Sequence, residues 1–397
     1  MTIPVHEVWL SVQRELHAVV LPAGPKLFRA VGAALDGSGP AVLPLSPALP
    51  APALRAALDA LRPTHVNGVR REGGVGVPAD VAVVIATSGS TGVPKGAQLS
   101  AEALRASASA SLRRLDAGAG ERWLCCLPPS HVSGLQVLVR SLLGGTEPIV
   151  HDGFSPEAVL SSGADHVSLV PTQLRRLLQV SSTRLTRLST FKTILLGGAA
   201  APPGLLAAAR AAGGRVVTTY GMSETCGGCV YDGEPLDGVG LGVGDDGRIR
   251  LSGPVLFSGY RLRPDLTEAV RDGDWFLTSD LGALEGGRLR VLGRADDVIN
   301  TGGEKVVAAA VAAVVAEHPA IVDAAVVGRP DPEWGERVVA VVVSPSPPSL
   351  AELRAFAKER LPGYAAPAEL VVVTEIPLLA NGKPDLEALR YGHDREP

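Results

Sequence analysis

Cysteine, lysine and net positive charge are all scarce in this chain of 397 residues. Four cysteines are too few for a disulfide framework in a chain of this size, which favours a reducing compartment such as the cytoplasm. Lysine and arginine together number 37, against 41 aspartates and glutamates, and the formal net charge is −4. Since no general basic excess is available to attract nucleic acid or an anionic membrane, any anionic ligand must be bound at a local site.

Long hydrophobic runs are also missing. The longest apolar stretch, residues 306–316, lies between Lys305 and Glu317, and it is shorter than the roughly 20 residues that span a bilayer. Near the N-terminus, Glu7 and Arg14 stand where a secretory signal would have an unbroken apolar stretch. We therefore expect a soluble cytoplasmic protein with no membrane insertion.

The composition is that of a folded protein. Hydrophobic residues make up 46% of the chain, and the 46 glycines and 32 prolines stay below the fraction of about 25–30% at which disorder becomes the default. At roughly 100–200 residues per domain, the length predicts two or three domains. Because six of the basic residues are lysines and the rest arginines, a lysine inside a motif is informative.

Short apolar runs alternate with helical patterns over residues 81–219. This alternation predicts an α/β body with a largely parallel sheet and helices on both faces. Residues 241–259 change to short alternating pieces, with Asp246-Gly247 as a hairpin signal, and predict a small antiparallel β-subdomain. Beyond residue 293, a hairpin, a helix over 304–317, two strands and a second helix predict a compact α+β domain. The predicted division is 1–293 for the N-terminal domain and 294–397 for the C-terminal domain.

A loop rich in glycine and hydroxyl groups, Thr87-Ser-Gly-Ser-Thr-Gly-Val-Pro-Lys-Gly96, follows the apolar run 81–86 and precedes a helical pattern from about Ser100. Strand, loop and helix in this order are typical of phosphate binding, because glycines let backbone N–H groups approach, hydroxyls donate hydrogen bonds and lysine supplies charge. The loop is not of the Walker form, since Lys95 is followed by Gly96. A flexible surface loop is the alternative, which the hydroxyls and the rare lysine disfavour.

This loop resembles the phosphate loop of the adenylate-forming enzymes, a superfamily of acyl- and aryl-CoA synthetases, adenylation domains and luciferases. The resemblance continues in order along the chain and covers nearly everything from Val81 onward. It implies a large N-terminal α/β body with a small β-subdomain, followed by a mobile α+β lid domain. The further matching segments are Pro129-Ser-His-Val-Ser-Gly134, Gly197-Gly-Ala-Ala200, Tyr220-Gly-Met-Ser-Glu-Thr225, Thr278-Ser-Asp-Leu-Gly282, Gly293-Arg-Ala-Asp-Asp-Val-Ile299 and Asn381-Gly-Lys-Pro-Asp385.

The resemblance implies an enzyme that joins a carboxylate to the α-phosphate of ATP and releases pyrophosphate. Such a site must hold anions that repel each other, so it needs positive charge and Mg²⁺. Glu224 would ligate Mg²⁺, since one carboxylate with phosphates and waters is normal for this ion. Ser223, where the family commonly has threonine, would reach the α-phosphate with its hydroxyl. The loop residues implied to bind ATP are Thr87, Ser88, Gly89, Ser90, Thr91, Gly92 and Lys95.

The nucleoside part of ATP is implied to contact other segments. Asp280 resembles the residue that accepts hydrogen bonds from both ribose hydroxyls, as an ionised carboxylate can with its two oxygens. Arg294 resembles a residue that also reaches the ribose. By itself a lone aspartate in a turn is usually a turn residue, which is the alternative for Asp280. The adenine is implied to lie between a wall of small residues, Gly198 and Ala199, and the face of Tyr220, with Gly221 adjoining.

The resemblance also implies moving parts in the C-terminal domain. Lys383 resembles the lysine that the lid inserts between substrate carboxylate and α-phosphate to compensate developing charge, although by position alone it would be a solvated surface charge. Asp296 resembles the hinge about which the lid turns after adenylation. Gly302 and Gly303 would line the tunnel for the pantetheine arm of coenzyme A, and a simple turn is compatible with that role.

The acid substrate is implied to contact His131, Ser133 and Thr219. A lone histidine is more often structural or exposed, and that alternative stays open for His131. Cys226 and Cys229 have the spacing of a redox or metal pair, but no second pair lies at zinc-finger distance. We interpret them as small side chains in the wall behind the predicted magnesium ligand.

Within the superfamily, the short segment before the phosphate loop and the motifs at 127–136 and 220–226 most resemble o-succinylbenzoate-CoA ligases of menaquinone biosynthesis. The implied partners are a small carboxylic acid, ATP and coenzyme A, without nucleic acid, and a homodimer is left open. The alternatives are a stand-alone adenylation enzyme that supplies a carrier protein and a CoA ligase for another aromatic or fatty acid. A catalytically dead nucleotide-binding module is disfavoured because the charged motif residues are present: Lys95, Glu224, Asp280, Arg294 and Lys383.

Overall fold

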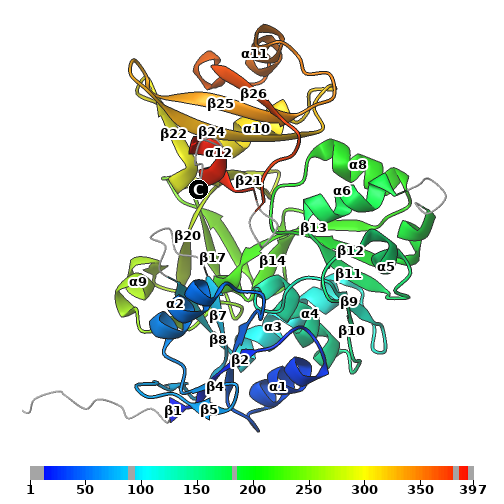
Figure 1. The fold of residues 1–397 in the computed structure, drawn as a ribbon, viewed down its shortest axis with the longest axis vertical. Helices are drawn as coiled ribbons and strands as arrows, with labels where there is room; N and C mark the ends of the chain where they lie inside the picture. The colour runs from blue at the N-terminus through cyan, green and yellow to red at the C-terminus, as the bar shows by residue number, and fades with distance from the viewer. Residues whose placement is uncertain (1–12, 88–93, 181–185, 379–383, 392–397) are drawn as a thin grey trace, which may run out of the picture.

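A computed structural model describes residues 13–87, 94–180, 186–378 and 384–391. Two seven-stranded sheets form most of the body, a smaller antiparallel sheet follows them, and the C-terminal residues form a separate sheet at the top of Figure 1. Among the described residues, no helix has the length and apolar character needed to cross a membrane.

The first large sheet has the strand order β18-β8-β7-β3-β2-β4-β5. Strands β2, β3 and β7 run parallel, and β8 returns antiparallel beside β7. The central strands are buried, as their continuous apolar sequence predicts. A separate pair, β1 (Gln13–Arg14) and β6 (Val77–Pro78), adjoins it. The strands are β2 (Leu16–Val20), β3 (Ala41–Leu45), β4 (His65–Val66), β5 (Val69–Arg70), β7 (Val81–Thr87), β8 (Lys95–Ser100) and β18 (Gly259–Tyr260).

The second large sheet has the order β10-β9-β11-β12-β13-β14-β15. Its strands from β10 to β13 are parallel, whereas β14 and β15 are antiparallel additions at one edge. The parallel strands therefore end at one common edge, where the loops that follow them gather. The strands are β9 (Trp123–Cys125), β10 (Ile149–Val150), β11 (His166–Leu169), β12 (Thr193–Leu196), β13 (Val216–Met222), β14 (Gly227–Tyr231) and β15 (Glu234–Pro235).

Helices lie between the two large sheets and on their outer faces. The main core joins α1 (Pro25–Asp36), α3 (Ala101–Leu115) and α4 (Val132–Leu143) to residues from both sheets. The outer face of the second sheet is covered by α5 (Pro156–Leu160), α6 (Pro171–Gln179) and α8 (Pro203–Ala211). Helix α2 (Ala51–Leu61) covers the outer face of the first sheet. Ser100 caps α3, since the backbone N–H of Ala103 donates to Ser100 Oγ at 3.0 Å.

The predicted β-subdomain is a five-stranded antiparallel sheet. Its first hairpin turns at Asp246-Gly247, where Gly247 has a φ of 77°. Helix α9 (Pro264–Ala269) precedes its last hairpin. The strands are β16 (Gly240–Val243), β17 (Arg248–Ser252), β19 (Arg271–Asp272), β20 (Trp275–Glu285) and β21 (Arg288–Arg294).

The C-terminal residues form a mixed sheet with two small cores of its own. The last strand of the body, β21, ends at Arg294, and the first strand of the C-terminal sheet begins at Val298. The elements are β22 (Val298–Thr301), β23 (Glu304–Val307), α10 (Ala308–Val315), β24 (Asp323–Asp331), β25 (Gly335–Val343), α11 (Leu350–Lys358), β26 (Glu369–Val373) and α12 (Leu386–Tyr391).

The predicted fold class is confirmed, with two local corrections. The predicted helix 304–317 is wrong in its first turn, because residues 304–307 form β23 in a hairpin closed by Gly302-Gly303, and α10 begins at Ala308. The glycine-rich loop does not lead directly into a helix, because β8 lies between the loop and α3 and pairs with β7. Both corrections arise from strand pairing, which a local helical pattern does not contain.

Candidate functional site

The predicted phosphate loop joins two antiparallel strands. Thr87 at the end of β7 pairs with Lys95 at the start of β8, so both residues lie at the base of the loop. The ammonium group of Lys95 lies 5.6 Å from the centre of the Tyr260 ring, a cation–π distance. Five predicted ATP-binding residues lie outside the described residues: Ser88, Gly89, Ser90, Thr91 and Gly92.

Glu224, the predicted magnesium ligand, lies beside the base of this loop. It belongs to a short 3₁₀ helix, residues 223–225, which follows β13 and also contains Ser223. The Tyr260 hydroxyl donates to Glu224 Oε1 at 2.7 Å. Because β18 pairs with β8, Tyr260 is carried to the same place as Lys95. Burial and the neighbouring carboxylate raise the pKa of Tyr260, which keeps this hydroxyl a donor.

The backbone after Glu224 is held from two helices. The Cys226 carbonyl accepts hydrogen bonds from Gln136 Nε2 at 2.6 Å and from Ser107 Oγ at 3.1 Å. Cys226 has a φ of 52°, so these two donors fix a left-handed residue directly behind the magnesium ligand. Cys226 and Cys229 are buried and free, and burial raises both thiol pKa values. This environment fits the interpretation of the cysteines as small wall residues.

The predicted ribose residue is linked to two other predicted site residues. The Tyr220 hydroxyl donates to Asp280 Oδ2 at 2.8 Å, and burial followed by the Asp280 charge raises the pKa of Tyr220. Asp280 is the strand partner of Arg294, and Arg294 Nη1 lies 3.8 Å from Asp280 Oδ1. The structure therefore brings β13, β20 and β21 together at one half-buried carboxylate.

The other predicted contacts lie at the common edge of the second sheet. Gly198 and Ala199 follow β12 and are exposed, while Thr219 lies on the adjacent strand β13. Gly198 has a φ of 84°, and the neighbouring Gly197 is needed because a Cβ there would lie 2.8 Å from the Thr219 methyl group. The Thr219 hydroxyl is buried and has no hydrogen-bond partner among the described residues.

His131 and Ser133 lie at the same edge of the second sheet, because α4, whose start they flank, follows β9. His131 is half-buried immediately before the helix, and Ser133 is exposed in its first turn. Gly134 permits this tight entry, because a Cβ there would lie 2.4 Å from the Pro128 carbonyl oxygen. The loop after β9 thus delivers both predicted acid-binding residues beside the loops after β12 and β13.

Arg140 lies two turns further along α4 and belongs to no sequence motif. Its side chain is buried, lies 4.2 Å above the Trp123 ring and donates from Nη2 to Ser168 Oγ at 3.0 Å. Among the described residues, no carboxylate lies within ion-pair distance of it, and Nε lacks a partner. Burial lowers the pKa of Arg140. A buried cation without a protein anion is a candidate receptor for an anionic ligand.

The predicted hinge has its own ion pair. Arg294 donates from Nε and Nη2 to the two Asp296 oxygens at 2.8 and 2.7 Å. The preceding Gly293 has a φ of 151°, and a Cβ there would lie 2.6 Å from Val307 of β23. Close contact between β21 and the C-terminal elements therefore requires glycine at this position.

The two predicted CoA-tunnel glycines form the β22–β23 turn. Gly302 and Gly303 have φ values of 60° and 83° and are exposed. This geometry is that of a tight hairpin, which needs glycine at both positions. Lys383 lies outside the described residues, and Leu378 and Pro384 on either side of its segment form an antiparallel bridge.

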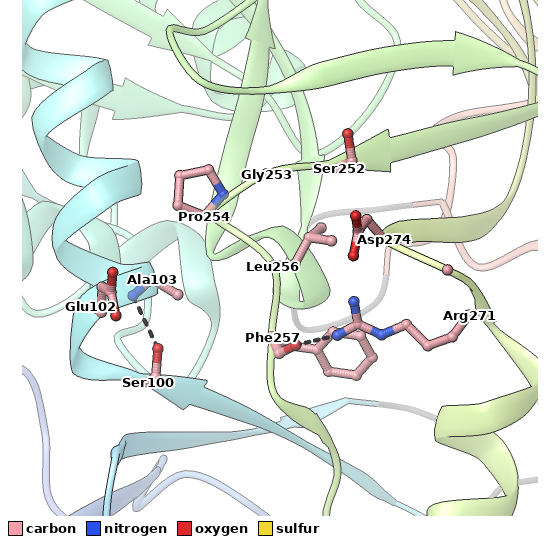
Figure 2. Close-up of a pocket in the computed structure, with 11 residues that line it drawn as sticks. Ser100, Glu102, Ala103, Ser252, Gly253, Pro254, Leu256, Phe257, Arg271 and Asp274 are labelled. Atoms are coloured by element: carbon pink, nitrogen blue, oxygen red, sulfur yellow. Dashed lines mark hydrogen bonds between the residues drawn. The ribbon is translucent and has the colours of Figure 1, made fainter.

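A cavity of about 560 Å³ lies elsewhere, between the start of α3 and the loop after β17 (Figure 2). Within it, Arg271 donates to the Phe257 carbonyl at 2.5 Å and lies 5.2 Å from the centre of that ring. The predicted site residues do not line this cavity. Its position does not support a role in the adenylation site.

Comparisons with known proteins agree with this geometry. The family described as "AMP-binding enzyme" matches residues 71–261, and "AMP-binding enzyme C-terminal domain" matches residues 310–383. A "Probable 2-succinylbenzoate--CoA ligase" of Mycobacterium tuberculosis (strain ATCC 25618 / H37Rv) is 44% identical over 391 residues, which are 95% of this chain and 97% of the relative. This chain belongs to the AMP-binding enzyme family.

Solved structures resemble this chain over nearly its full length. An o-succinylbenzoate CoA synthetase (MenE) from Bacillus subtilis, in complex with the acyl-adenylate intermediate OSB-AMP, has a TM-score of 0.81 and 29% identity, covering 98% of this chain and 90% of that one. The same synthetase in complex with ATP and a magnesium ion has a TM-score of 0.80 and 29% identity, covering 96% and 90%.

The predicted superfamily and enzyme class are therefore confirmed for this AMP-binding enzyme. Its individual site residues stay predictions. The geometry brings several of them into two groups, one around Glu224 and Lys95 and one around Asp280.

Proposed function

We propose that this AMP-binding enzyme is a 2-succinylbenzoate–CoA ligase of menaquinone biosynthesis. The observation that carries the proposal is the end-to-end match, at 44% identity, with a relative of that name. In the first step a carboxylate oxygen of the acid bonds to the α-phosphorus of ATP, and the bond to the β-phosphate breaks to release pyrophosphate. In the second step the thiol of coenzyme A attacks the acyl carbon, and AMP leaves.

Lys95 and Glu224 would serve the phosphate end of ATP. The half-buried Glu224 carboxylate, oriented by Tyr260, fits the single protein ligand that Mg²⁺ commonly takes beside phosphates. When bound, Mg²⁺ supplies positive charge that neutralises phosphate oxygens. Lys95, at the base of the loop, adds a fixed charge on the same side, and the Ser223 hydroxyl lies next to Glu224 in the chain.

Asp280 would hold the ribose, with Arg294 beside it. Tyr220 restrains one carboxylate oxygen through its hydroxyl, which orients the group before the nucleotide arrives. The exposed backbone at Gly198 and Ala199 leaves space at the end of β12 against which a planar base can lie. These assignments place the nucleotide across the common edge of the second sheet.

Arg140 would bind the ring carboxylate of the acid. It is buried on α4, the helix whose N-terminal end carries His131 and Ser133. The buried Thr219 hydroxyl, which has no hydrogen-bond partner among the described residues, would be a second polar contact for the acid. A diacid needs two separate recognition elements, because its second carboxylate must be neutralised while the first one reacts.

Residues 294–397 would form the mobile C-terminal domain, on a body of residues 1–293. The Arg294–Asp296 ion pair lies where the domains join, and rotation about Asp296 would exchange Lys383 for the Gly302-Gly303 turn at the active site. Lys383 would stabilise charge during adenylation, and the two glycines would pass the pantetheine arm. A cytoplasmic location and a homodimer stay predictions.

The decisive experiment measures ATP-dependent pyrophosphate release from a panel of aromatic and aliphatic acids, with and without coenzyme A. We expect 2-succinylbenzoate to be preferred and to yield 2-succinylbenzoyl-CoA and AMP. Pyrophosphate release with thioester formed only on a carrier protein would establish the carrier-directed alternative. Absence of turnover with 2-succinylbenzoate would overturn the proposed substrate.

A second experiment separates the half-reactions. Lys383→Ala should abolish adenylation yet spare thioester formation from supplied acyl-adenylate, whereas Lys358→Ala, an exposed lysine on α11, should change neither. Equal loss of both half-reactions in Lys383→Ala would contradict the assigned role.

A further inference from the structure

We infer that Glu15, His17 and His65 form a binding site on the first large sheet for Zn²⁺ or a similar divalent metal ion. Strands β2 and β4 run parallel, and His17 is the direct partner of His65. Partners in adjacent strands point to the same face, so the two imidazoles lie side by side with ring centres 4.2 Å apart. Glu15, two residues before His17, points to the same face.

The three donor groups are already gathered. His17 Nε2 lies 3.2 Å from Glu15 Oε2, His65 Nδ1 lies 4.0 Å from the same oxygen, and all three donors lie within 4.8 Å of one another. Bonds of about 2.0–2.2 Å in tetrahedral zinc place ligand atoms about 3.4 Å apart. Small side-chain rotations would therefore suffice to close the site around an ion.

The donor chemistry selects the class of metal. Two imidazoles and one carboxylate suit Zn²⁺, Co²⁺, Ni²⁺ or Cu²⁺, whereas Mg²⁺ prefers oxygen ligands alone. The side chains of His17 and His65 are 24% and 16% exposed, and that of Glu15 is 60% exposed. The ion can therefore enter from solvent and keep water in the fourth position.

The backbone that carries these side chains is fixed. Thr64 Oγ1 accepts from the Leu16 N–H at 3.0 Å and donates to the Leu16 carbonyl at 2.8 Å, which ties β4 to β2. The Thr64 hydroxyl proton is donated to the Leu16 carbonyl. In the 3.1 Å contact between Thr64 Oγ1 and His65 Nδ1, the imidazole N–H is therefore the donor and the hydroxyl oxygen the acceptor. Metal binding at Nδ1 would displace this proton.

The site would act as a cross-link. It joins β2 to the β4–β5 hairpin at the end of the molecule away from the C-terminal sheet (Figure 1). An ion bound there stabilises the folded state without contacting the adenylation site. Arg70, the strand partner of His65 on β5, brings a positive charge to the same face, so this residue should weaken cation binding.

The test uses the full-length, tag-free and metal-free protein. Zn²⁺ titrated by calorimetry, and Co²⁺ followed by its visible absorption band, should each show a one-to-one site that raises the unfolding temperature. His17→Asn, His65→Asn and Glu15→Gln should each weaken binding by at least about tenfold, while Arg70→Gln should strengthen it. His318→Asn, in the C-terminal domain, is the matched control and should bind as the unaltered protein does.

Two results would overturn the inference. One is a Co²⁺ absorption band and a Zn²⁺ binding heat in the unaltered protein that are no larger than those of the His17→Asn/His65→Asn double variant. Circular dichroism must show that this double variant is folded. The other is loss of the site in His6→Asn or His318→Asn with retention in His17→Asn. The adenylation assay should be unchanged in His17→Asn, so this site and the proposed enzymatic function stand or fall separately.

Discussion

The Tyr260 hydroxyl donates a hydrogen bond of 2.7 Å to Glu224, and the ring that carries it faces Lys95. One side chain therefore contacts the proposed magnesium ligand and the proposed phosphate-binding cation at once. The arrangement depends on the β18–β8 pairing, which brings residue 260 beside the start of β8. Tyr260 is thus a positioning residue that orients the Glu224 carboxylate.

Tyr260→Phe should therefore raise the Mg²⁺ concentration needed for half-maximal adenylation and lower the rate. A hydrogen bond to a charged group contributes about 1.5–3 kcal/mol, so we expect roughly a tenfold to hundredfold loss of kcat/KM at limiting Mg²⁺. Initial rates of pyrophosphate release over a magnesium series measure the effect, and saturating Mg²⁺ should restore part of it.

Tyr231→Phe is the control for loss of a tyrosine hydroxyl. Tyr231 is buried and its hydroxyl lies 2.8 Å from Ser111 Oγ. This variant should lose stability without a change in magnesium dependence. If both variants show the same magnesium dependence as the unaltered enzyme, Tyr260 does not position Glu224.

Arg140→Gln should remove discrimination for the ring carboxylate of the acid. Truncating one partner of a buried charge pair costs about 2–5 kcal/mol, so kcat/KM for 2-succinylbenzoate should fall by roughly thirtyfold or more. With 4-oxo-4-phenylbutanoate, which lacks the ring carboxylate, the same variant should lose little. Arg140→Lys should retain an intermediate preference, because the charge stays but the planar donor geometry does not. Equal losses with both acids would contradict the assignment.

Helix α4 could be predicted from the local sequence, whereas the burial of Arg140 within it could not. The alternation of apolar runs and helical patterns predicted over residues 81–219 is confirmed at α4, which follows a Pro-Pro-Ser turn and ends before a glycine pair. The importance of Arg140 was not predicted, because its burial is created by Trp123 on β9 and Ser168 on β11. A cation inside a helix has no local signal that distinguishes burial from exposure.

The same limit explains the other differences. Motif order predicted Glu224, Asp280 and Tyr220 as site residues. It did not predict the hydrogen bonds from Tyr260 to Glu224 and from Tyr220 to Asp280, since these span 36 and 60 residues. His17 and His65 come together through a parallel register that the local sequence does not specify. Sequence patterns thus predict elements and motif chemistry, whereas the contacts that orient the motifs depend on long-range pairing.

The structure contains an ion pair between the body and the C-terminal elements. Arg175 Nη1 on α6 lies 2.5 Å from Asp323 Oδ2 on β24, and both side chains are about three-quarters buried or more. If the C-terminal domain turns between half-reactions, this pair must break. Arg175→Gln and Asp323→Asn should therefore shift the ratio of adenylation to thioester-forming rates in the same direction, by about fivefold for a pair of about 1 kcal/mol.

The exchanged variant Arg175→Asp/Asp323→Arg provides the control for this ion pair. It restores opposite charges in the same place, so it should return the ratio toward the original value. Single-turnover measurements of each half-reaction give the two rates. An unchanged ratio in both single variants would show that the contact does not bias the domain arrangement.

Acid should destabilise the protein in two steps, through Glu121 and His166. Burial opposes ionisation of Glu121, but hydrogen bonds from Lys192 and His166 prevail and lower its pKa to about 2, from 4.5. Burial lowers the pKa of His166 below 6.5, against the opposing effect of Glu121. In both cases the unfolded chain binds protons first as the pH falls, so the free energy of unfolding declines below about pH 6.5 and again between about 4.5 and 2.

Glu121→Gln should abolish the lower of these two steps. The depressed pKa corresponds to at most about 3 kcal/mol at neutral pH, and the side chain is 18% exposed, so we expect a loss of about 2 kcal/mol in the variant. Urea unfolding from pH 3 to 8 measures this, with Glu72→Gln, an exposed carboxylate, as the control. Because Glu121 also holds His166 at 2.8 Å, its removal should move the upper step as well, by lowering the pKa of the imidazole further. A variant with the same pH profile as the unaltered protein would show that this carboxylate does not contribute to acid sensitivity.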